Sequence, residues 1–187
     1  TVSDLSAQHT TWDVLAEHTK LFVTFGGVPT KNAQSSPGGA GHHRVGPGLR
    51  EMARRGVRFV NIGPCNDNLD VDCRAEWIHC RPNADVALML ALAWQIHADD
   101  AHDRDFLARC TVGFEKFLPY LLGEQDGIAK TPEWASRLTG VPSKRIVELA
   151  REMAETRTMV NVAWSLQRAH NGEQAFWMAI TLAAMLG

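Results

Sequence analysis

The sequence lacks an excess of charge of either sign. Its 19 Lys and Arg residues stand against 21 Asp and Glu residues, which gives a formal net charge of -2. Without a basic field, the chain has no long-range attraction for a nucleic-acid backbone or an anionic membrane. A signal peptide and an apolar run of about 18 residues, which a transmembrane helix needs, are also missing. We therefore expect no nucleic-acid partner and no transmembrane segment.

Cysteine is scarce, with 4 residues among 187. Cys65, Cys73, Cys80 and Cys110 form neither a CxxC pair nor a spacing with His that is typical of zinc. We expect free, buried thiols, which favour a reducing compartment, and no metal site. A disulfide scaffold is unnecessary because a chain of this length can bury a sizeable core.

Glycine-rich nucleotide motifs and common catalytic motifs are missing too. The segment GGAGHH (38–43) lacks the ending of a P-loop, and no GxGxxG follows the first apolar run. Ser165 does not lie in a GxSxG motif, and His170 with Glu173 forms half a metal site at most. An ordinary dehydrogenase therefore has weak support, and we expect no metal-binding or catalytic residue in this chain.

The sequence does contain a regular alternation of strand and helix patterns. Short apolar runs ended by Gly, Pro or polar residues predict strands over 20–27, 56–64, 75–82 and 158–164. Helices are predicted from just after Pro47 to Gly56 and over 83–100. This order predicts an α/β, Rossmann-like fold with a mainly parallel sheet and helices on both faces.

Residues 101–155 are predicted to be helical. Helices are expected over 102–110, 113–123, 131–140 and 142–155, with Thr131 as an N-cap and Pro132 at a first helical position. We expect a single α/β domain over 1–187 in which 101–155 is a helical insertion. The absence of an initial Met also indicates a segment of a longer chain.

Polar loops follow all of the predicted strands. In a parallel sheet the carboxyl ends of the strands lie at one edge, and ligands bind there. The loop over 26–44 is unusually long, which is typical of binding or disordered loops. It contains Lys31, which is either a phosphate ligand or a solvated lysine.

The loop after the third predicted strand gives the clearest physical argument for an anion-binding site. Asn83 and Asp85 begin the predicted helix over 83–100, where unpaired N–H groups and the helix dipole favour an anion. The guanidinium group of Arg81 adds a positive charge and paired N–H donors beside them. Asp85 either accepts two N–H bonds from a guanine edge or caps the helix, and the pattern leaves both possibilities open.

The loop after the fourth strand, NVAWSLQRAHNGEQ (161–174), carries more hydrogen-bonding side chains than a turn needs. Trp164 is either a core aromatic or a flat wall against a ring system. In the second case, Ser165, Gln167 and Arg168 would bond the heteroatoms of that ring. A buried polar ring system must have its donors and acceptors satisfied, which would explain the density of polar side chains.

Four stretches of the sequence carry a family resemblance: TFGGVPTKNAQ, RPNADVALMLALAW, HDRDFLARCTVGFEKFLPYL and WSLQRAHNGEQAFWMAITLAAMLG. They resemble the molybdopterin oxidoreductases of the dimethyl sulfoxide, trimethylamine N-oxide and biotin sulfoxide reductase branch. The resemblance implies a segment of a much larger enzyme with a molybdenum bis(molybdopterin guanine dinucleotide) cofactor. Such an enzyme would reduce a small S-oxide or N-oxide by oxygen-atom transfer. Its molybdenum ligand would lie in a preceding part of the polypeptide, and the remaining domains of that polypeptide would be the partners of this segment.

The resemblance also implies roles for individual residues. Asp85 would hold the guanine, four residues would shape the ribose and phosphate pocket, and four would approach the pterin and the substrate funnel. The implied cofactor-binding residues are Lys31, Gly63, Pro64, Arg81, Pro82, Asp85, Trp164, Ser165, Gln167 and Arg168. Members of the branch are cytoplasmic or periplasmic bacterial enzymes, so both compartments stay open. The alternative is a non-catalytic nucleotide-binding or scaffolding α/β domain.

Overall fold

The computed structural model describes residues 10–33 and 42–187. In these residues, four parallel strands form one sheet in the order β3-β2-β1-β4. The strands are β1 (Leu21–Phe25), β2 (Arg58–Gly63), β3 (Glu76–His79) and β4 (Thr158–Val162). Each lies within its range predicted from the sequence. Most of the glycine-rich part of the predicted 26–44 loop lies outside the described residues.

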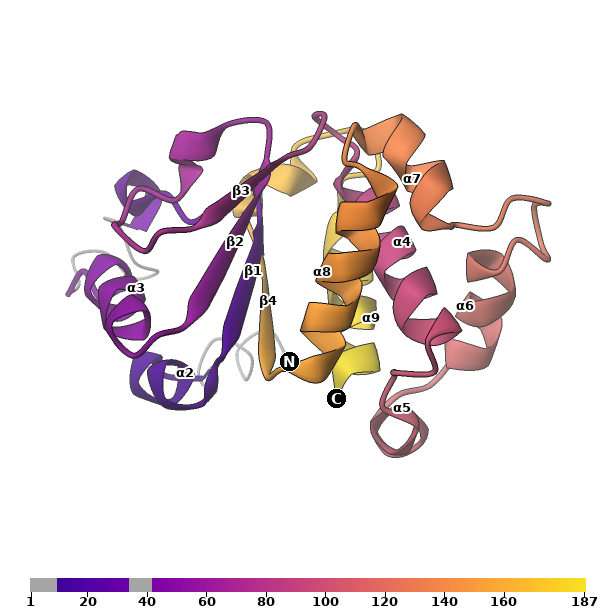
Figure 1. The fold of residues 1–187 in the computed structure, drawn as a ribbon, viewed down its shortest axis with the longest axis horizontal. Helices are drawn as coiled ribbons and strands as arrows, with labels where there is room; N and C mark the ends of the chain where they lie inside the picture. The colour runs from indigo at the N-terminus through magenta and orange to yellow at the C-terminus, as the bar shows by residue number, and fades with distance from the viewer. Residues whose placement is uncertain (1–9, 34–41) are drawn as a thin grey trace.

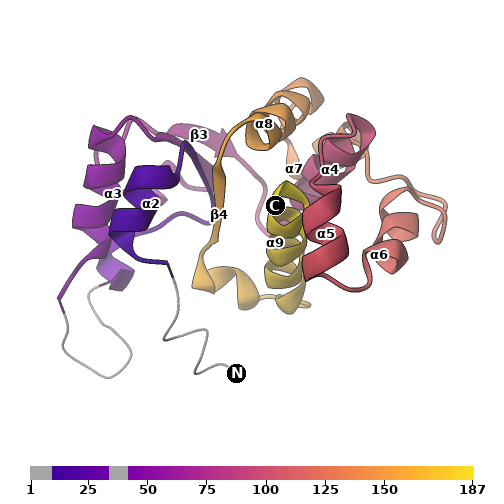
Figure 2. The same ribbon diagram turned by 90° about the horizontal axis from the view of Figure 1, so that it is seen from below.

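Helices cover both faces of this sheet (Figure 1). On one face lie α2 (Trp12–His18) and α3 (Val45–Arg54), and on the other lie α4 (Asp85–Ala98), α8 (Ser143–Glu155) and α9 (Glu173–Leu186). Farther from the sheet lie α5 (Arg104–Cys110), α6 (Phe114–Leu121) and α7 (Pro132–Thr139) (Figure 2). The predicted α/β fold, with a parallel sheet and helices on both faces, is confirmed.

The core consists of two apolar layers because side chains alternate across the strands. Val23 and Phe25 of β1 join the layer that contains α4, α8 and α9. Phe22 of β1 and Phe59 of β2 join the layer under α3, with ring centroids 5.4 Å apart. Helix α4 is apolar on nearly every side because it contacts α7, α8 and α9.

The observed helices differ from the prediction at several of their ends, and one helix was not predicted. Helix α3 begins at Val45, so the predicted start after Pro47 is wrong. Proline fits the first turn because the amide it lacks would have no intrahelical partner there. Helix α2 was not predicted. It packs so closely on α3 that a Cβ added to Gly48 would lie 2.3 Å from the Trp12 ring, and this contact is absent from local sequence patterns.

Other local predictions are confirmed in detail. Thr131 caps α7 by accepting a hydrogen bond from the Trp134 amide at 3.2 Å, and Pro132 is the first helical residue. All the cysteines are free, as predicted. Cys73 and Cys80 are buried, whereas Cys65 and Cys110 are exposed, so the expectation of burial was wrong for the latter two.

In the part of the chain that the structure describes, we find no helix with both the length and the apolar character needed to cross a bilayer.

Candidate functional site

The carboxyl ends of β1 and β4 meet where the chain changes direction across the sheet. From β1 the chain proceeds to β2 and β3 on one side, and after α8 it returns to β4 on the other side of β1. In open parallel sheets, ligands bind in the crevice at such a switch point. Two hollows open here, and Gly26, Asn68 and Ser165 line both of them.

The first hollow has a volume of about 230 Å³ and is reached by the loops after all the strands. Its lining includes Pro64 after β2, Pro82 after β3, Asp85 at the start of α4, and Ser165 and Arg168 after β4. The structure therefore brings these predicted site residues together. Other polar side chains in the lining are Asn68, Asn83, His170 and Asn171.

The second hollow has a volume of about 430 Å³ and lies between the loops after β1 and β4. Lys31 and Trp164 line it, together with Asn32 and Asn161. Trp164 is 71% exposed and contacts the Phe176 ring edge to face, with centroids 6.0 Å apart. Trp164 is therefore a surface aromatic beside the hollow, and the alternative of a core aromatic is wrong.

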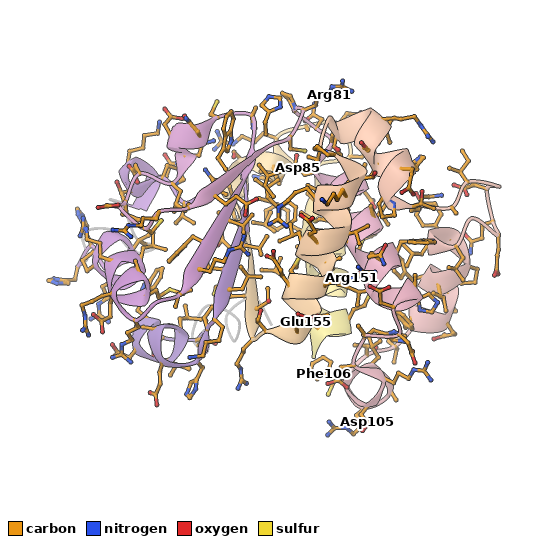
Figure 3. All side chains as sticks on the ribbon, viewed as in Figure 1. Arg81, Asp85, Asp105, Phe106, Arg151 and Glu155 are labelled. Atoms are coloured by element: carbon orange, nitrogen blue, oxygen red, sulfur yellow. The ribbon has the colours of Figure 1, made fainter. Side chains whose placement is uncertain are left out.

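Asp85 is a part-buried carboxylate that lines the first hollow. It is the first residue of α4, and the N-cap position belongs to Ala84, which makes no side-chain capping bond. Burial raises the pKa of Asp85, and a bond from its own amide offsets this effect in part. A buried carboxylate is normally hydrogen-bonded, so Asp85 is suited to receive donors from a ligand. Figure 3 shows it near the ends of the strands.

Arg81 lies near the same end of the molecule but is engaged elsewhere (Figure 3). Its Nη1 donates to the carbonyl oxygens of Arg137 at 2.8 Å and Leu138 at 3.3 Å, and its amide donates to Thr139 O at 2.9 Å. These bonds satisfy carbonyl groups at the end of α7, where a helix lacks internal donors. Arg81 is not in the lining of either hollow.

Gly63 and Gln167 are also not in the lining of the two hollows. Gly63 ends β2, and its carbonyl oxygen accepts bonds from Trp77 Nε1 at 3.0 Å and the Cys80 amide at 3.3 Å. Gln167 has an exposed side chain, and a Cβ added to Gly172 would lie 2.1 Å from its carbonyl oxygen. Both residues therefore shape the loops at the site, and direct contact with a ligand stays a prediction.

Asn68 is a site residue that sequence reasoning missed. Its carbonyl oxygen accepts a bond from the Val28 amide at 2.7 Å, which joins the loops after β1 and β2. Gly27 has a φ of +79°, and a Cβ added there would lie 2.3 Å from the same oxygen. The Gly26-Gly27 pair at the end of β1 was the sequence signal for this close contact.

His170 and Asn171 were missed as well. They belong to the segment 161–174 that was singled out for its polarity, and both line the first hollow from the turn before α9. Asn171 has a φ of +58°, in the left-handed region that Asn tolerates better than most residues. An Asn-Gly pair before an apolar helix was the available signal.

The two hollows therefore provide binding groups. They offer amide, hydroxyl and imidazole groups, a part-buried carboxylate at Asp85, and the cations Lys31 and Arg168. Such a lining can bind a polar ring system and an anion side by side. Among the described residues, no group of three or more His, Cys, Asp or Glu side chains is arranged to hold a metal ion.

Comparison with known proteins identifies the class. The model of the family described as "Molybdopterin oxidoreductase" matches residues 3–187, so the chain belongs to this family. It is 49% identical over 180 residues to biotin sulfoxide reductase from Cereibacter sphaeroides, covering 96% of this chain and 24% of that protein. It is 44% identical over 183 residues to dimethyl sulfoxide/trimethylamine N-oxide reductase from Rhodobacter capsulatus, covering 96% of this chain and 22% of that protein.

One further relative and one solved structure are also similar to this chain. Trimethylamine-N-oxide reductase 1 from Escherichia coli K12 is 37% identical over 186 residues, covering 96% of this chain and 22% of that protein. The solved structure of acetylene hydratase from Pelobacter acetylenicus matches with a TM-score of 0.69 and 20% identity, covering 92% of this chain and 22% of that one. This last likeness concerns the fold. The chain thus spans about a quarter or less of the length of these relatives.

Proposed function

We propose that this chain is the part of a molybdenum-dependent S-oxide or N-oxide reductase that binds a molybdopterin guanine dinucleotide arm of the cofactor. The observation that carries the proposal is Asp85, a part-buried carboxylate without a capping role, in a hollow formed by the loops after every strand. The sulfoxide and N-oxide reductases among the relatives support the substrate class.

The lining of the two hollows fits such a cofactor. Asp85 would accept N–H groups of the guanine, while Pro64 and Pro82 would shape the adjacent wall. Lys31 and Arg168 would offset the charge of the phosphates. A volume of about 430 Å³ lies within the usual range for a ligand site, roughly 300–1,000 Å³, whereas the first hollow is smaller and suits one ring system.

The cofactor would supply oxygen-atom transfer and the accompanying two-electron exchange, while this chain supplies position and electrostatics. Ser165, which lines both hollows, and Trp164 would contact the pterin side of the ligand. The exposed Trp164 ring would cover a flat ring system and exclude water from it. Gly63, Arg81 and Gln167 would act indirectly, by shaping the loops that carry the ligating residues.

We also propose that residues 1–187 form one α/β unit of the longer enzyme, with 101–155 as a helical insertion. Helices α5, α6 and α7 lie away from the sheet, which supports this division (Figure 2). Helix α8 returns the chain to the sheet: its buried side chains belong to the same core layer as those of β1.

Guanine recognition gives the sharpest test of this proposal. We would titrate the chain with guanosine diphosphate by calorimetry and repeat the titration with adenosine diphosphate. A carboxylate bonded to two N–H groups of guanine contributes charge-assisted bonds that adenine cannot form, so we expect at least about tenfold tighter binding of the guanine nucleotide. We expect Asp85→Asn to remove this preference, because its amide presents a donor where a second acceptor is needed.

Asp105→Asn is the matched control for this test. Asp105 is an exposed residue in the first turn of α5, far from Asp85 in Figure 3. The control should bind guanosine diphosphate as the parent chain does. Equal affinity for the two nucleotides, or an unchanged preference in Asp85→Asn, would contradict the proposal.

A further inference from the structure

Asp70 ties the loop after β2 to the loop after β1. Its carboxylate accepts a bond from the Thr30 hydroxyl at 2.6 Å and a second bond from the Thr30 amide at 3.0 Å. The two residues are 40 positions apart in the chain, so this is a tertiary contact. The strands themselves do not need it, because every residue of β1 already pairs with a residue of β2.

Thr30 begins the short 3₁₀ helix η1 (Thr30–Ala33), and Lys31 follows it directly. One turn of such a helix is weakly stable alone, because few hydrogen bonds repay the lost backbone freedom. The bond between the Val28 amide and Asn68 O, at 2.7 Å, holds the loop just before this turn. The bonds to Asp70 therefore complete a two-point attachment that places Lys31 in the wall of the second hollow.

The charge of Asp70 also reaches Lys31. Burial alone would raise the pKa of Asp70, but the Thr30 hydroxyl and amide bonds and the nearby Lys31 cation together lower it. Asp70 consequently has two opposite effects on an anion at Lys31. Its bonds to Thr30 hold Lys31 in place, while its negative charge weakens the local attraction for a phosphate.

We propose that Asp70 is a positioning residue of the site: through its bonds to Thr30, it orders residues 28–32 and holds Lys31 ready to bind a phosphate. This inference rests on the proposed function for its ligand. Ordering the loop before binding reduces the entropy that the ligand must offset, which is the physical gain from such an attachment.

Hydrogen–deuterium exchange tests the ordering without any ligand. Thr30→Val keeps the shape of the side chain but removes the hydroxyl, while Thr30→Ser keeps both bonds. We expect amides in 28–32 to exchange at least about tenfold faster in Thr30→Val, since a bond to a charged acceptor is lost, and to return near the parental rate in Thr30→Ser. Parental exchange rates in Thr30→Val would overturn the proposal.

Calorimetry with guanosine diphosphate tests the connection to Lys31. We expect Thr30→Val and Lys31→Ala each to weaken binding of guanosine diphosphate about three- to tenfold. The double variant should bind with the affinity of whichever single variant binds more weakly. Additive losses would mean that Thr30 acts independently of Lys31 and would overturn the proposal. Thr181→Val, which removes a hydroxyl bond inside α9, should leave binding unchanged.

The sign of the effect of Asp70→Asn separates position from charge. If positioning dominates, as we propose, the variant binds guanosine diphosphate more weakly. If charge dominates, the removal of a negative group beside Lys31 strengthens binding, and the proposal is wrong. Absence of guanosine diphosphate binding by the parent chain would refute the proposed function and the phosphate role of Lys31, whereas the exchange experiment would still decide whether Asp70 orders the loop.

Discussion

Two carboxyl groups at opposite ends of the sheet, those of Glu76 and Asp85, have opposite surroundings. At the amino ends of β2 and β3, Arg58 and Glu76 join Arg145 and Glu152 of α8 in one ion-pair network. Arg145 binds both carboxylate oxygens of Glu76, at 2.7 and 2.9 Å. At the carboxyl edge, Asp85 lies part-buried in a hollow without a comparable partner. The network around Glu76 thus stabilises the fold, whereas the Asp85 carboxylate has hydrogen-bonding capacity that the protein leaves unused.

The pKa values of the two carboxyl groups express this difference. The bonds from Arg145 lower the pKa of Glu76, with further help from Arg58, although burial opposes them. Burial raises the pKa of Asp85 because few donors compensate for the lost water. One carboxylate therefore contributes to stability in its charged form, and the other reduces stability in its charged form.

The largest expected effect concerns glycines with the same backbone conformation at different ends of the sheet. Gly27→Ala should lower the free energy of unfolding by about 3 kcal/mol, because a left-handed φ is combined with a clash against Asn68 O. Gly56, before β2, has a φ of +80° and open space around its Cβ position, so Gly56→Ala should cost only about 1 kcal/mol. Urea denaturation measures both. Equal losses would show that the contact with Asn68 does not constrain the edge.

The second prediction breaks the ion-pair network at the amino ends. Arg145→Ala should lower the free energy of unfolding by about 2 kcal/mol, because it leaves the half-buried Glu76 with fewer partners. Arg151→Ala is the matched control: it breaks the more exposed pair between α8 and Asp99 and should cost less than about 1 kcal/mol. The network would have no special role in stability if the two variants unfolded at the same denaturant concentration.

The third prediction concerns Asp85 in the absence of ligand. Asp85→Asn should raise the free energy of unfolding at pH 7 by about 1 kcal/mol, because it removes a part-buried charge that the protein compensates only in part. The same variant should lose its preference for guanosine diphosphate. A loss of stability at pH 7 would mean that the carboxylate has a structural partner in the folded chain, which would weaken the contrast between the two ends.

The smallest expected effect is the pH dependence of the stability changes caused by Asp85→Asn and Arg145→Ala. The folded chain holds a proton on Asp85 more tightly than the unfolded chain, so the charge penalty appears as pH rises from the ordinary value of 3.8 through the raised pKa. The advantage of Asp85→Asn should therefore shrink by about 0.5 kcal/mol between pH 7 and about pH 4.

For Glu76 the sign is opposite, because its lowered pKa contributes stability above its ordinary value of 4.5 and loses it as the pH falls through the lowered pKa. The cost of Arg145→Ala should consequently shrink below about pH 4.5. Denaturation of the parent chain and both variants across this range measures these changes. If the difference in unfolding free energy between a variant and the parent chain grew as the pH was lowered, the direction of the pKa shift assigned to that carboxyl group would be wrong.

Local sequence patterns predicted much of this architecture. The strands, the capping of α7 by Thr131 and the position of Asp85 at the start of α4 follow from neighbouring residues, because apolar periodicity and capping act over a few positions. The polarity of the loops after the strands likewise predicted a candidate site at one edge of the sheet. This polarity pointed to Trp164, Ser165 and Arg168, which line the two hollows, whereas Pro64 and Pro82 were named through the family resemblance.

Long-range contacts decided the rest. The sequence by itself determined which segments become strands and helices and which strand ends are polar. Tertiary structure placed β4 beside β1, directed Arg81 to the end of α7, and brought Asn68 and Asp70 against the loop that carries Lys31. The physical reason is that periodicity and capping depend on neighbours in the chain, whereas the partner of a loop side chain depends on which distant surfaces pack against each other.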